Sequence, residues 1–297
     1  MAKDNNVAEK EHTRGSALAR AEQVLGESGV DDARLNAQLL LAHVLKCERT
    51  ELLLRRHDRL TEIEAKEFQD LVKRRCGREP LQYLVGETDF MGFRIFVDPR
   101  VLIPRPETEV LVETLVGILA EGGMGETMQL LDIGTGSGNI AISIASRIKS
   151  CVFDALDVSA DALDVARRNI TYHHMEEKIH CIRGDVMTDR WYDPARRYHA
   201  IVSNPPYIPI SEFDGLQPEI RVFEPEFATT DGGDGLSFYR RIAVLGQRLL
   251  VPGGSIFLEI AYNMSDRVSE IFAKTGYSHF RVLNDYDQNP RVLIVKG

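Results

Sequence analysis

The apolar positions of the chain follow two different periods, which divide it into a helical part and an α/β part. Over residues 16–80, apolar side chains recur every three or four positions, as on one face of a helix. They are Leu18, Ala21, Leu25, Leu35, Leu39, Leu40, Ala42, Leu45, Leu52, Leu53, Leu54, Ile63, Phe68, Leu71 and Val72. Thr61 followed by Glu64 fits a capping box at a helix start. This pattern predicts a small helical bundle over residues 16–80.

Residues 81–104 have a different character. Aromatic and β-branched residues are separated here by glycines, which is typical of a β-hairpin. They are Phe90, Phe93, Ile95, Phe96 and Val97, with Gly86 and Gly92. We expect this segment to form a hairpin that links the helical bundle to the rest of the chain.

Short apolar runs alternate with helical patterns over residues 105–297. The runs predict strands at 129–133, 152–156, 179–182, 199–203 and 255–259. The helical patterns fall at 139–148, 160–170 and 236–250, and two last runs, 280–283 and 291–295, are expected to form an antiparallel edge pair. Strands that alternate with helices build parallel sheets. The sequence therefore predicts an α/β fold with a doubly wound, mostly parallel, seven-stranded sheet of the Rossmann-like kind.

Composition and charge narrow the classes of protein that fit. The 297 residues are 43% hydrophobic and 27% charged, as in a globular protein. No apolar run approaches the ~18 residues of a membrane span. Residues 1–105 carry 18 Lys and Arg and 18 Asp and Glu, so they are neutral. Residues 106–297 carry 18 Lys and Arg and 27 Asp and Glu, which accounts for the whole net charge of −9. Binding to nucleic acid needs a basic face, so we expect neither nucleic acid nor a membrane as a direct partner.

The four cysteines are Cys47, Cys76, Cys151 and Cys181, and their spacing fits neither a zinc site nor a redox pair. Free thiols are typical of a reducing compartment, and residues 1–15 lack an apolar signal region. We therefore expect a cytoplasmic protein that uses no metal.

The segment Asn204-Pro205-Pro206-Tyr207 directly follows the strand predicted at 199–203. Two prolines end the strand, because neither has an N–H and both fix φ. Open α/β sheets bind ligands at the carboxyl ends of their strands. The Asn204 side-chain oxygen and the Pro205 carbonyl oxygen would there form two fixed acceptors, which suit a planar NH2 group packed against Tyr207. The alternative is an ordinary turn, since Asn-Pro commonly starts one.

A glycine-rich segment, Asp132-Ile133-Gly134-Thr135-Gly136-Ser137-Gly138, follows the first predicted strand. Glycines let the backbone approach a ligand closely, and the next helix presents free N–H groups. The spacing is Gly-x-Gly-x-Gly, whereas nicotinamide sites use Gly-x-Gly-x-x-Gly. Asp132 would repel a diphosphate but not a cationic ligand.

The next two strand ends carry further polar residues. Asp157 is placed to bind both hydroxyls of a ribose, with a helix N-cap as the alternative. Asp185 and Val186 would bracket the edge of an adenine. A ribose, an adenine and a positive centre together describe S-adenosylmethionine.

Residues 132–138 and 204–207 together resemble the signature of class I S-adenosylmethionine-dependent amino-group methyltransferases. Further segments are similar to the bacterial release factor glutamine methyltransferases, namely residues 78–86, 102–109, 224–225, 231–236 and 239–240. The resemblance covers about residues 20–297. One departure lies after Glu259, where the family usually has glycine and glutamine and this chain has Ala261 and Asn263.

The resemblance implies a class I methyltransferase fold and an enzyme that methylates the amide nitrogen of the glutamine in the Gly-Gly-Gln motif of class 1 peptide chain release factors. S-adenosylmethionine is then the cofactor, S-adenosylhomocysteine the product and the release factor the protein partner. Because residues 16–80 contain no cofactor motif yet precede the hairpin, we expect them to recognise the substrate and residues 105–297 to carry the catalytic domain.

The implied chemistry agrees with the residues of the site. An amide nitrogen is a poor nucleophile, and acceptors at Asn204 and Pro205 would return electron density to it and aim it at the methyl group. Phe90 and Phe93 are candidate walls of the glutamine slot, with core packing as the alternative. For the roof of the site the candidates are Arg105 and Glu107, with a linker role as the alternative.

Two other functions compete with this one. A methyltransferase that acts on an exocyclic amine of DNA or RNA would use the same Asn-Pro-Pro-Tyr geometry, with the base stacked on Tyr207. The acidic charge of residues 106–297 argues against it. A non-catalytic module that binds the cofactor and escorts release factors is a third reading, and the intact Asn204 argues against that one.

Overall fold

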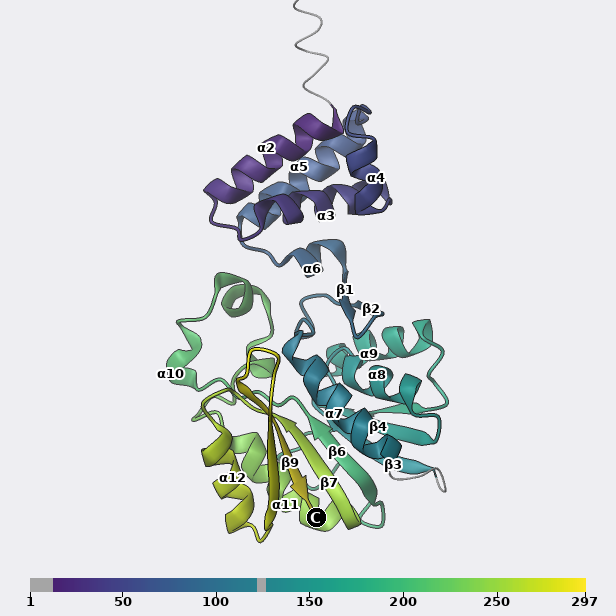
Figure 1. Ribbon diagram of the computed structural model, residues 1–297, viewed down its shortest axis with the longest axis vertical. Helices are drawn as coiled ribbons and strands as arrows, with labels where there is room; N and C mark the ends of the chain where they lie inside the picture. Colours follow the sequence, from purple (N-terminus) through teal and green to yellow (C-terminus); the bar gives the residue numbers. More distant parts are fainter. Residues whose placement is uncertain (1–12, 122–126) are drawn as a thin grey trace, which may run out of the picture. The chain divides into compact units, whose positions relative to one another are not determined.

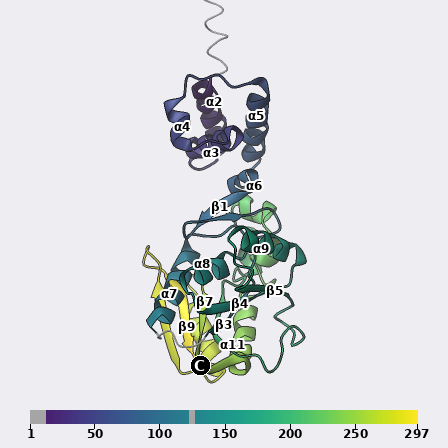
Figure 2. The same cartoon turned by 90° about the vertical axis from the view of Figure 1, so that its right-hand side faces the viewer.

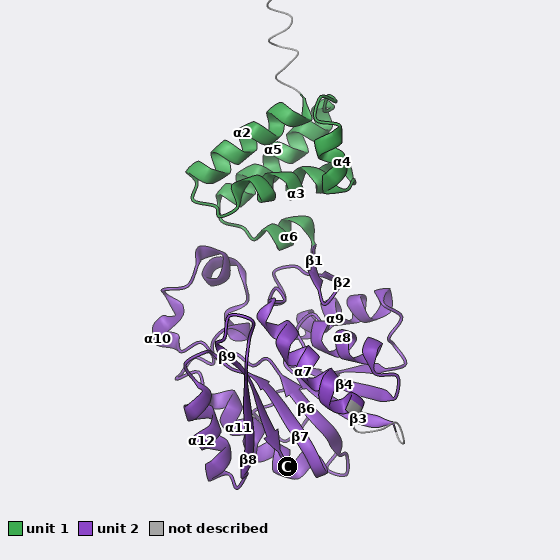
Figure 3. Cartoon of the chain, in the orientation of Figure 1, with its two compact units in different colours: residues 1–86 green, residues 87–297 purple. Residues whose placement is uncertain are grey.

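The structure is a computed structural model that describes residues 13–121 and 127–297. The chain divides into two compact units, residues 1–86 and 87–297 (Figure 3). No helix of the described ranges is both long enough and apolar enough to cross a membrane.

The first unit is helical. Its helices are α2 (Arg14–Glu27), α3 (Ala33–Leu45), α4 (Arg49–Leu54), α5 (Glu62–Cys76) and α6 (Leu81–Val85). Their apolar faces form one core in which Leu25, Leu40 and Leu52 are fully buried. The capping box expected at the start of α5 is confirmed, because Thr61 Oγ1 accepts from the Glu64 N–H and Glu64 Oε2 accepts from the Thr61 N–H.

The expected hairpin segment, residues 81–104, is strand only in its middle. Strands β1 (Glu87–Phe90) and β2 (Phe93–Phe96) pair antiparallel, with Thr88 opposite Ile95. Residues 81–85 form helix α6 instead, and Gly86, at φ +83°, provides its left-handed C-cap. Asn169 of helix α9 (Ala160–Tyr172) holds the hairpin, since its side chain accepts from the Phe96 N–H and donates to the Phe96 carbonyl.

The second unit contains the seven-stranded sheet, in the order β5-β4-β3-β6-β7-β9-β8 (Figure 1). Five strands are parallel, namely β3 (Met128–Ile133), β4 (Cys151–Asp157), β5 (Ile179–Arg183), β6 (Tyr198–Ser203) and β7 (Leu250–Glu259). The other two, β8 (His279–Asn284) and β9 (Pro290–Lys296), are antiparallel. The predicted doubly wound, mostly parallel sheet is confirmed.

Helices cover both faces of this sheet (Figures 1 and 2). One layer contains α7 (Glu107–Glu121), α8 (Asn139–Arg147) and α9 (Ala160–Tyr172), which pack against one another. The other contains α11 (Ser237–Leu249) and α12 (Ser265–Lys274), which enclose a core with Leu131, Ile201 and Leu258 of the strands. Between β6 and α11 lie three short helices, α10 (Ile210–Phe213), the π-helix η1 (Glu219–Phe223) and the 3-10 helix η2 (Glu226–Ala228).

The strand order places the candidate site. The chain runs from β3 outward through β4 to β5, and then returns to β6 on the other side of β3. The crevice at the carboxyl ends of β3 and β6 is therefore the topological switch point, where open α/β sheets bind ligands. The glycine-rich segment follows β3, and Asn204 follows β6.

Candidate active site

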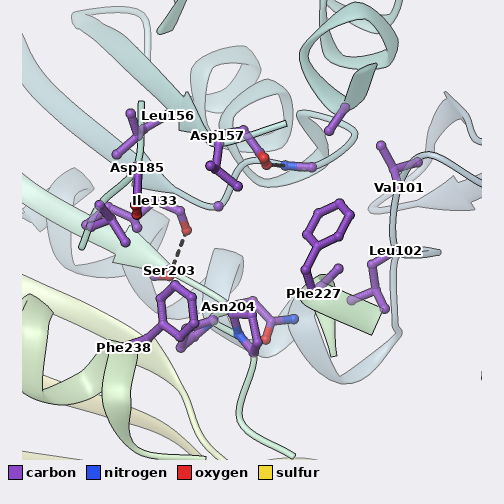
Figure 4. A pocket seen from close by; sticks show the side chains of 18 of the residues that line it. Val101, Leu102, Ile133, Leu156, Asp157, Asp185, Ser203, Asn204, Phe227 and Phe238 are labelled. Carbon is purple, nitrogen blue, oxygen red and sulfur yellow. Dashed lines mark hydrogen bonds between the residues drawn. The ribbon is translucent and has the colours of Figure 1, made fainter. Parts of the chain in front are cut away.

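A cavity lies at the carboxyl ends of strands β3, β4, β5 and β6 (Figure 4). Its lining combines glycine backbone, carboxylates and apolar side chains. The lining residues include Gly134, Gly136, Leu156, Asp157, Asp185, Val186, Asn204, Phe227 and Phe238. The structure thus brings together residues from all three strand ends that the sequence singled out for a cofactor and from the Asn-Pro-Pro-Tyr segment.

Two glycines of the loop after β3 face this cavity. Gly134 has φ +73° and Gly136 has φ +53°, a region that disfavours side chains. A Cβ atom built on either glycine would have no heavy atom within 4 Å. Both residues line the cavity, so the loop offers bare backbone to a ligand.

The other residues of the loop do not face the cavity. Thr135 and Ser137 are buried, and Gly138 packs towards Ala166 of α9. Asp132 is also fully buried and accepts a hydrogen bond from Thr135 Oγ1 at 2.7 Å. Burial, together with the charge of Asp157, raises the pKa of Asp132 to about 7. Asp132, Thr135, Ser137 and Gly138, which we expected to contact the cofactor, therefore do not line the cavity and support the loop from below.

Asp157 joins the loop to the end of β4. Its Oδ2 accepts from the Gly136 N–H at 2.9 Å, and its Oδ1 accepts from the Ser159 N–H at 3.0 Å. Burial raises the pKa of Asp157, while these two backbone hydrogen bonds lower it. Ser159, not Asp157, caps helix α9, because the Ser159 side chain accepts from the Ala162 N–H. The carboxylate of Asp157 thus remains at the cavity wall with further lone pairs free for a diol.

The end of β5 supplies the third side of the cavity. Asp185 is exposed and Val186 is buried, and both line the cavity as expected. Gly184 precedes them, and a Cβ atom on this glycine would overlap Trp191. Close packing against Trp191 therefore requires glycine at this position, a constraint that the sequence did not reveal.

A second cavity lies on the other side of Asn204 and Pro205. These two residues line both cavities. The second cavity is otherwise lined by polar and charged side chains and a few apolar ones, among them Arg105, Glu107, Tyr207, Ile220, Thr229, Glu259 and Arg291. Arg105 and Glu107 thus lie at this cavity, and their role as a roof stays a prediction.

Asn204 takes part in a buried hydrogen-bond chain. Its Nδ2 donates to Thr108 Oγ1 at 3.1 Å, and Thr108 Oγ1 donates to Glu259 Oε2 at 2.6 Å. The Tyr207 hydroxyl donates to Glu259 Oε1 at 3.2 Å. Burial, followed by the charge of Glu259, raises the pKa of Tyr207 well above its usual range, so Tyr207 stays protonated. The Asn204 Oδ1 and the Pro205 carbonyl oxygen accept no hydrogen bond from the residues described here, so both remain available as acceptors.

The loop from Asp231 to Gly235 supports Tyr207. Asp231 accepts hydrogen bonds from the N–H groups of Gly233, Gly235 and Ser237, at 2.8, 2.9 and 2.9 Å. Gly235 has φ +76°, and a Cβ atom on it would overlap the Tyr207 carbonyl oxygen. This segment, which the sequence matched only by resemblance, therefore has a packing role behind the Asn-Pro-Pro-Tyr segment.

Phe90 and Phe93 do not line either cavity, which corrects their assignment as walls of the glutamine slot. Phe90 is buried in the core, and Phe93 packs edge-on against His173 and under the guanidinium of Arg147. The reason is the packing of the hairpin, since strand β2 contacts helix α9 and Arg147 at the end of α8 reaches both Phe93 and the Met91 carbonyl oxygen.

Other residues of the site were missed by the sequence analysis. Thr108 bonds Asn204 directly and Glu259 acts through Thr108, and Glu224 forms an ion pair with Arg105 at 2.6 Å. Glu259 lies at the end of a correctly predicted strand, so its position at the same sheet edge was the available signal. The departures after Glu259 do not alter the site, because Ala261 packs partly on the core and Asn263 is exposed.

Comparisons with known proteins agree with this site. Residues 16–86 match the family described as PrmC N-terminal domain, and residues 106–214 match the methyltransferase small domain. The release factor glutamine methyltransferase of Chlorobaculum tepidum is 39% identical over 90% of this chain and 91% of that protein. That of Geobacter sulfurreducens is 36% identical over 85% of this chain and 86% of that protein.

A solved structure of the hMettl16 catalytic domain, in complex with MAT2A 3'UTR hairpin 6, is 18% identical. It covers 76% of this chain and 81% of that chain, with a TM-score of 0.53. At this identity the likeness shows the shared methyltransferase fold alone. The sequence identity over nearly the whole of both relatives shows more: the chain belongs to the release factor glutamine methyltransferase family.

Proposed function

We propose that this protein methylates the side-chain amide nitrogen of the glutamine in the Gly-Gly-Gln motif of class 1 peptide chain release factors, with S-adenosylmethionine as the methyl donor. The observation that carries the proposal is that Asn204 and Pro205 border two cavities at once. A group held in one cavity can therefore react with a group held in the other. The names of relatives such as those of Chlorobaculum tepidum and Caulobacter vibrioides support the choice of substrate.

The first cavity fits S-adenosylmethionine. Gly134 and Gly136 leave open the space that a Cβ would fill, so their backbone suits the amino-acid portion. Asp157 would hold the ribose hydroxyls, and Asp185 and Val186 would flank the adenine. When bound, S-adenosylmethionine supplies an electrophilic methyl group. We propose no metal for this reaction, since the donor set of the cavity suits a nucleoside.

The residues of the chain supply orientation and hydrogen-bond acceptors. Asn204 Oδ1 would accept one N–H of the substrate amide, and the Pro205 carbonyl oxygen would accept the other. Two acceptors fix the plane of the amide and raise the electron density on its nitrogen, and their contribution grows as positive charge develops there. The rigid Pro205-Pro206 exit from β6 keeps both acceptors in place. The amide proton can leave after methyl transfer, so no side chain has to remove it first.

The substrate amide would occupy the second cavity. Tyr207 lies there with its hydroxyl bonded to Glu259, which leaves its ring as an apolar surface for the amide plane. We propose that residues 16–80 recognise the release factor, that residues 81–104 link the two parts and that residues 105–297 carry out the transfer. Because release factors act in translation termination, the reaction would take place in the cytoplasm.

Methyl transfer to purified acceptors tests this function. Labelled S-adenosylmethionine, the protein and a class 1 release factor should give labelled release factor, with the label located on the glutamine by mass spectrometry. A release factor with Gly-Gly-Ala in place of Gly-Gly-Gln is the matched control and should stay unlabelled. DNA and RNA are assayed in parallel. Label on either nucleic acid and none on the release factor would favour transfer to an exocyclic amine instead.

A further inference from the structure

Three elements that are far apart in the sequence meet behind Asn204. Thr108 lies in the first turn of α7, Glu259 is the last residue of β7 and Tyr207 follows β6. Thr108 is 2% exposed and Glu259 is 1% exposed. The chain of bonds runs from Asn204 Nδ2 to Thr108 Oγ1 (3.1 Å) and from Thr108 Oγ1 to Glu259 Oε2 (2.6 Å). Thr108 lines neither cavity, and Glu259 lines the second cavity with both carboxylate oxygens already bonded.

The number of protons available in this chain of hydrogen bonds decides which end of the Asn204 side-chain amide lies against Thr108. A carboxylate can only accept hydrogen bonds, and a threonine hydroxyl has one proton to donate. The short bond to Glu259 uses that proton, so Thr108 Oγ1 can offer only a lone pair to Asn204. The Asn204 atom that lies against Thr108 must therefore be the NH2 group. Its oxygen is left on the side away from Thr108.

We propose that Thr108 and Glu259 are positioning residues that fix the orientation of the Asn204 amide, so that its oxygen, not its NH2 group, faces the substrate. This inference rests on the proposed function. The reversed amide would present two donors to the NH2 group of the glutamine, and two donors cannot form a hydrogen bond with each other. The orientation of the amide therefore decides whether Asn204 accepts a hydrogen bond from the substrate or repels it.

The surrounding structure holds both residues firmly. Ser203 is paired with Leu258 in the β6–β7 ladder, so the next residues, Asn204 just after β6 and Glu259 at the end of β7, lie side by side. Glu259 is also paired with Val292 of β9, and its carbonyl oxygen accepts from the Tyr239 hydroxyl at 2.8 Å. The Tyr207 hydroxyl occupies the second carboxylate oxygen. The carboxylate therefore has little freedom to turn away from Thr108.

The charge state of Glu259 follows from the groups that face it. Its pKa is raised above the usual range, because burial outweighs the bonds from Thr108 and Tyr207 and the charge of Arg291 on β9, which lower it. Glu107 on α7 raises it, and Tyr239 on α11 also faces this carboxyl group. A protonated Glu259 could donate to Thr108, whose proton would then turn towards Asn204 and favour the reversed amide. The rate of transfer should therefore fall as the pH is lowered through the pKa of Glu259.

Substitutions at Thr108 test the proposal on the full-length protein. Thr108→Val keeps the shape and removes the hydroxyl, and it should lower the single-turnover rate roughly 10–100-fold, the loss typical of partners that orient a functional side chain. KM for the release factor and the affinity for S-adenosylmethionine should change less than threefold. Thr108→Ser restores the hydroxyl and should recover most of the rate. The matched control is Thr275→Val, which removes a remote hydroxyl bonded to Ile271 and should leave the rate unchanged.

The pH profile adds a test that a merely structural role would not pass. The wild-type rate should show an acid limb, and Glu259→Gln, which cannot titrate, should be slower and should lack that limb. An acid limb that persists in Glu259→Gln would assign the titration to another group and overturn the role of Glu259.

A measurement without substrate separates this inference from the proposed function. The side-chain NH2 protons of Asn204, assigned by their loss in Asn204→Asp, should exchange slowly with water in the wild type and in Thr108→Ser, and fast in Thr108→Val. Equal exchange in all three proteins would overturn the inference even if release factor is methylated. Slow exchange that depends on Thr108 would support it even if another amide proved to be the substrate.

Discussion

Gly235 packs directly against the carbonyl oxygen of Tyr207, which leaves no room for a Cβ atom, and its φ of +76° also disfavours any other residue. Gly235→Ala should therefore shift the Asn-Pro-Pro-Tyr segment and destabilise the protein by about 1–3 kcal/mol, the range for a strained backbone position. Chemical denaturation and methyl-transfer assays measure the two effects. Gly232→Ala is the matched control, because Gly232 has φ +70° but open space around its Cβ position. If both variants lose the same activity, the close contact has no part in the site.

The carboxylate of Asp157 should contribute to cofactor binding. Asp157→Ala is expected to weaken S-adenosylmethionine binding by roughly 1–3 kcal/mol, the scale of a charged hydrogen bond, with calorimetry as the measurement. The comparison is Asp161→Ala, in the first turn of α9 and exposed to solvent, which should bind as the wild type does. If Asp157→Ala bound S-adenosylmethionine with wild-type affinity, Asp157 would not be the residue that binds the ribose.

Asn204→Ala should lower the rate of methyl transfer about 100–1,000-fold, as expected for loss of one preorganised partner in the transition state. Affinity for S-adenosylmethionine should change little, because the other residues of that cavity remain. Asn204→Asp keeps the shape and adds a negative charge beside the sulfonium, which would stabilise the bound ground state and slow transfer. Single-turnover assays with parallel binding measurements check both. Near wild-type turnover by Asn204→Ala would show that another group holds the substrate amide.

The ion pair of Arg105 and Glu224 makes a pH prediction. Glu224 is almost fully buried, and burial raises its pKa while Arg105 lowers it. Arg105→Ala should leave a buried carboxylate without its partner and cost about 1–3 kcal/mol of stability near pH 8. The loss should shrink as the pH falls through the raised pKa of Glu224, because the protonated form needs no cation. Thermal melts of Arg105→Ala and of Arg105→Ala with Glu224→Gln, compared at pH 5 and pH 8, test this. A loss equal at both pH values would contradict it.

The helical unit should be dispensable for cofactor binding but not for activity on the intact substrate. A truncated chain that begins at Glu87 retains every residue that lines the cofactor cavity. It should bind S-adenosylmethionine with wild-type affinity and lose most of its kcat/KM on intact release factor. An unchanged kcat/KM would mean that residues 16–80 do not select the substrate.

The strands of the second unit could be predicted because each is a continuous apolar run bounded by turn residues. The predicted run 199–203 corresponds to Tyr198–Ser203, and 255–259 corresponds to the end of Leu250–Glu259. Helix α12 was missed although Val268 and Phe272, four residues apart, form its buried face. Gly86 was interpreted as a hairpin glycine, but it ends helix α6. A glycine with positive φ serves either purpose, and only the packing of α6 decides between them.

The candidate site was predictable only where its residues are contiguous with a strand end. Asn204 directly follows β6 and Asp157 is the last residue of β4, and both carry recognisable local chemistry. Thr108 lies 96 residues from Asn204 and 151 residues from Glu259, so its role appears only when the strand register is known. Phe90 and Phe93 were misplaced for a related reason, because the local pattern predicts a hairpin but not the helices on which it packs.

The pairing of β3 with β6 has a consequence for the reaction as a whole. Ile133 lies opposite Ser203, and the Ser203 hydroxyl donates to the Ile133 carbonyl oxygen at 2.7 Å. The glycine-rich segment and the Asn-Pro-Pro-Tyr segment thus begin at the same level on neighbouring strands, which lie about 4.8 Å apart in any sheet. The spacing between these two segments is set by the sheet itself, and under the proposed function it would separate the methyl donor from its acceptor. Substitutions in the cavity walls leave that spacing unchanged.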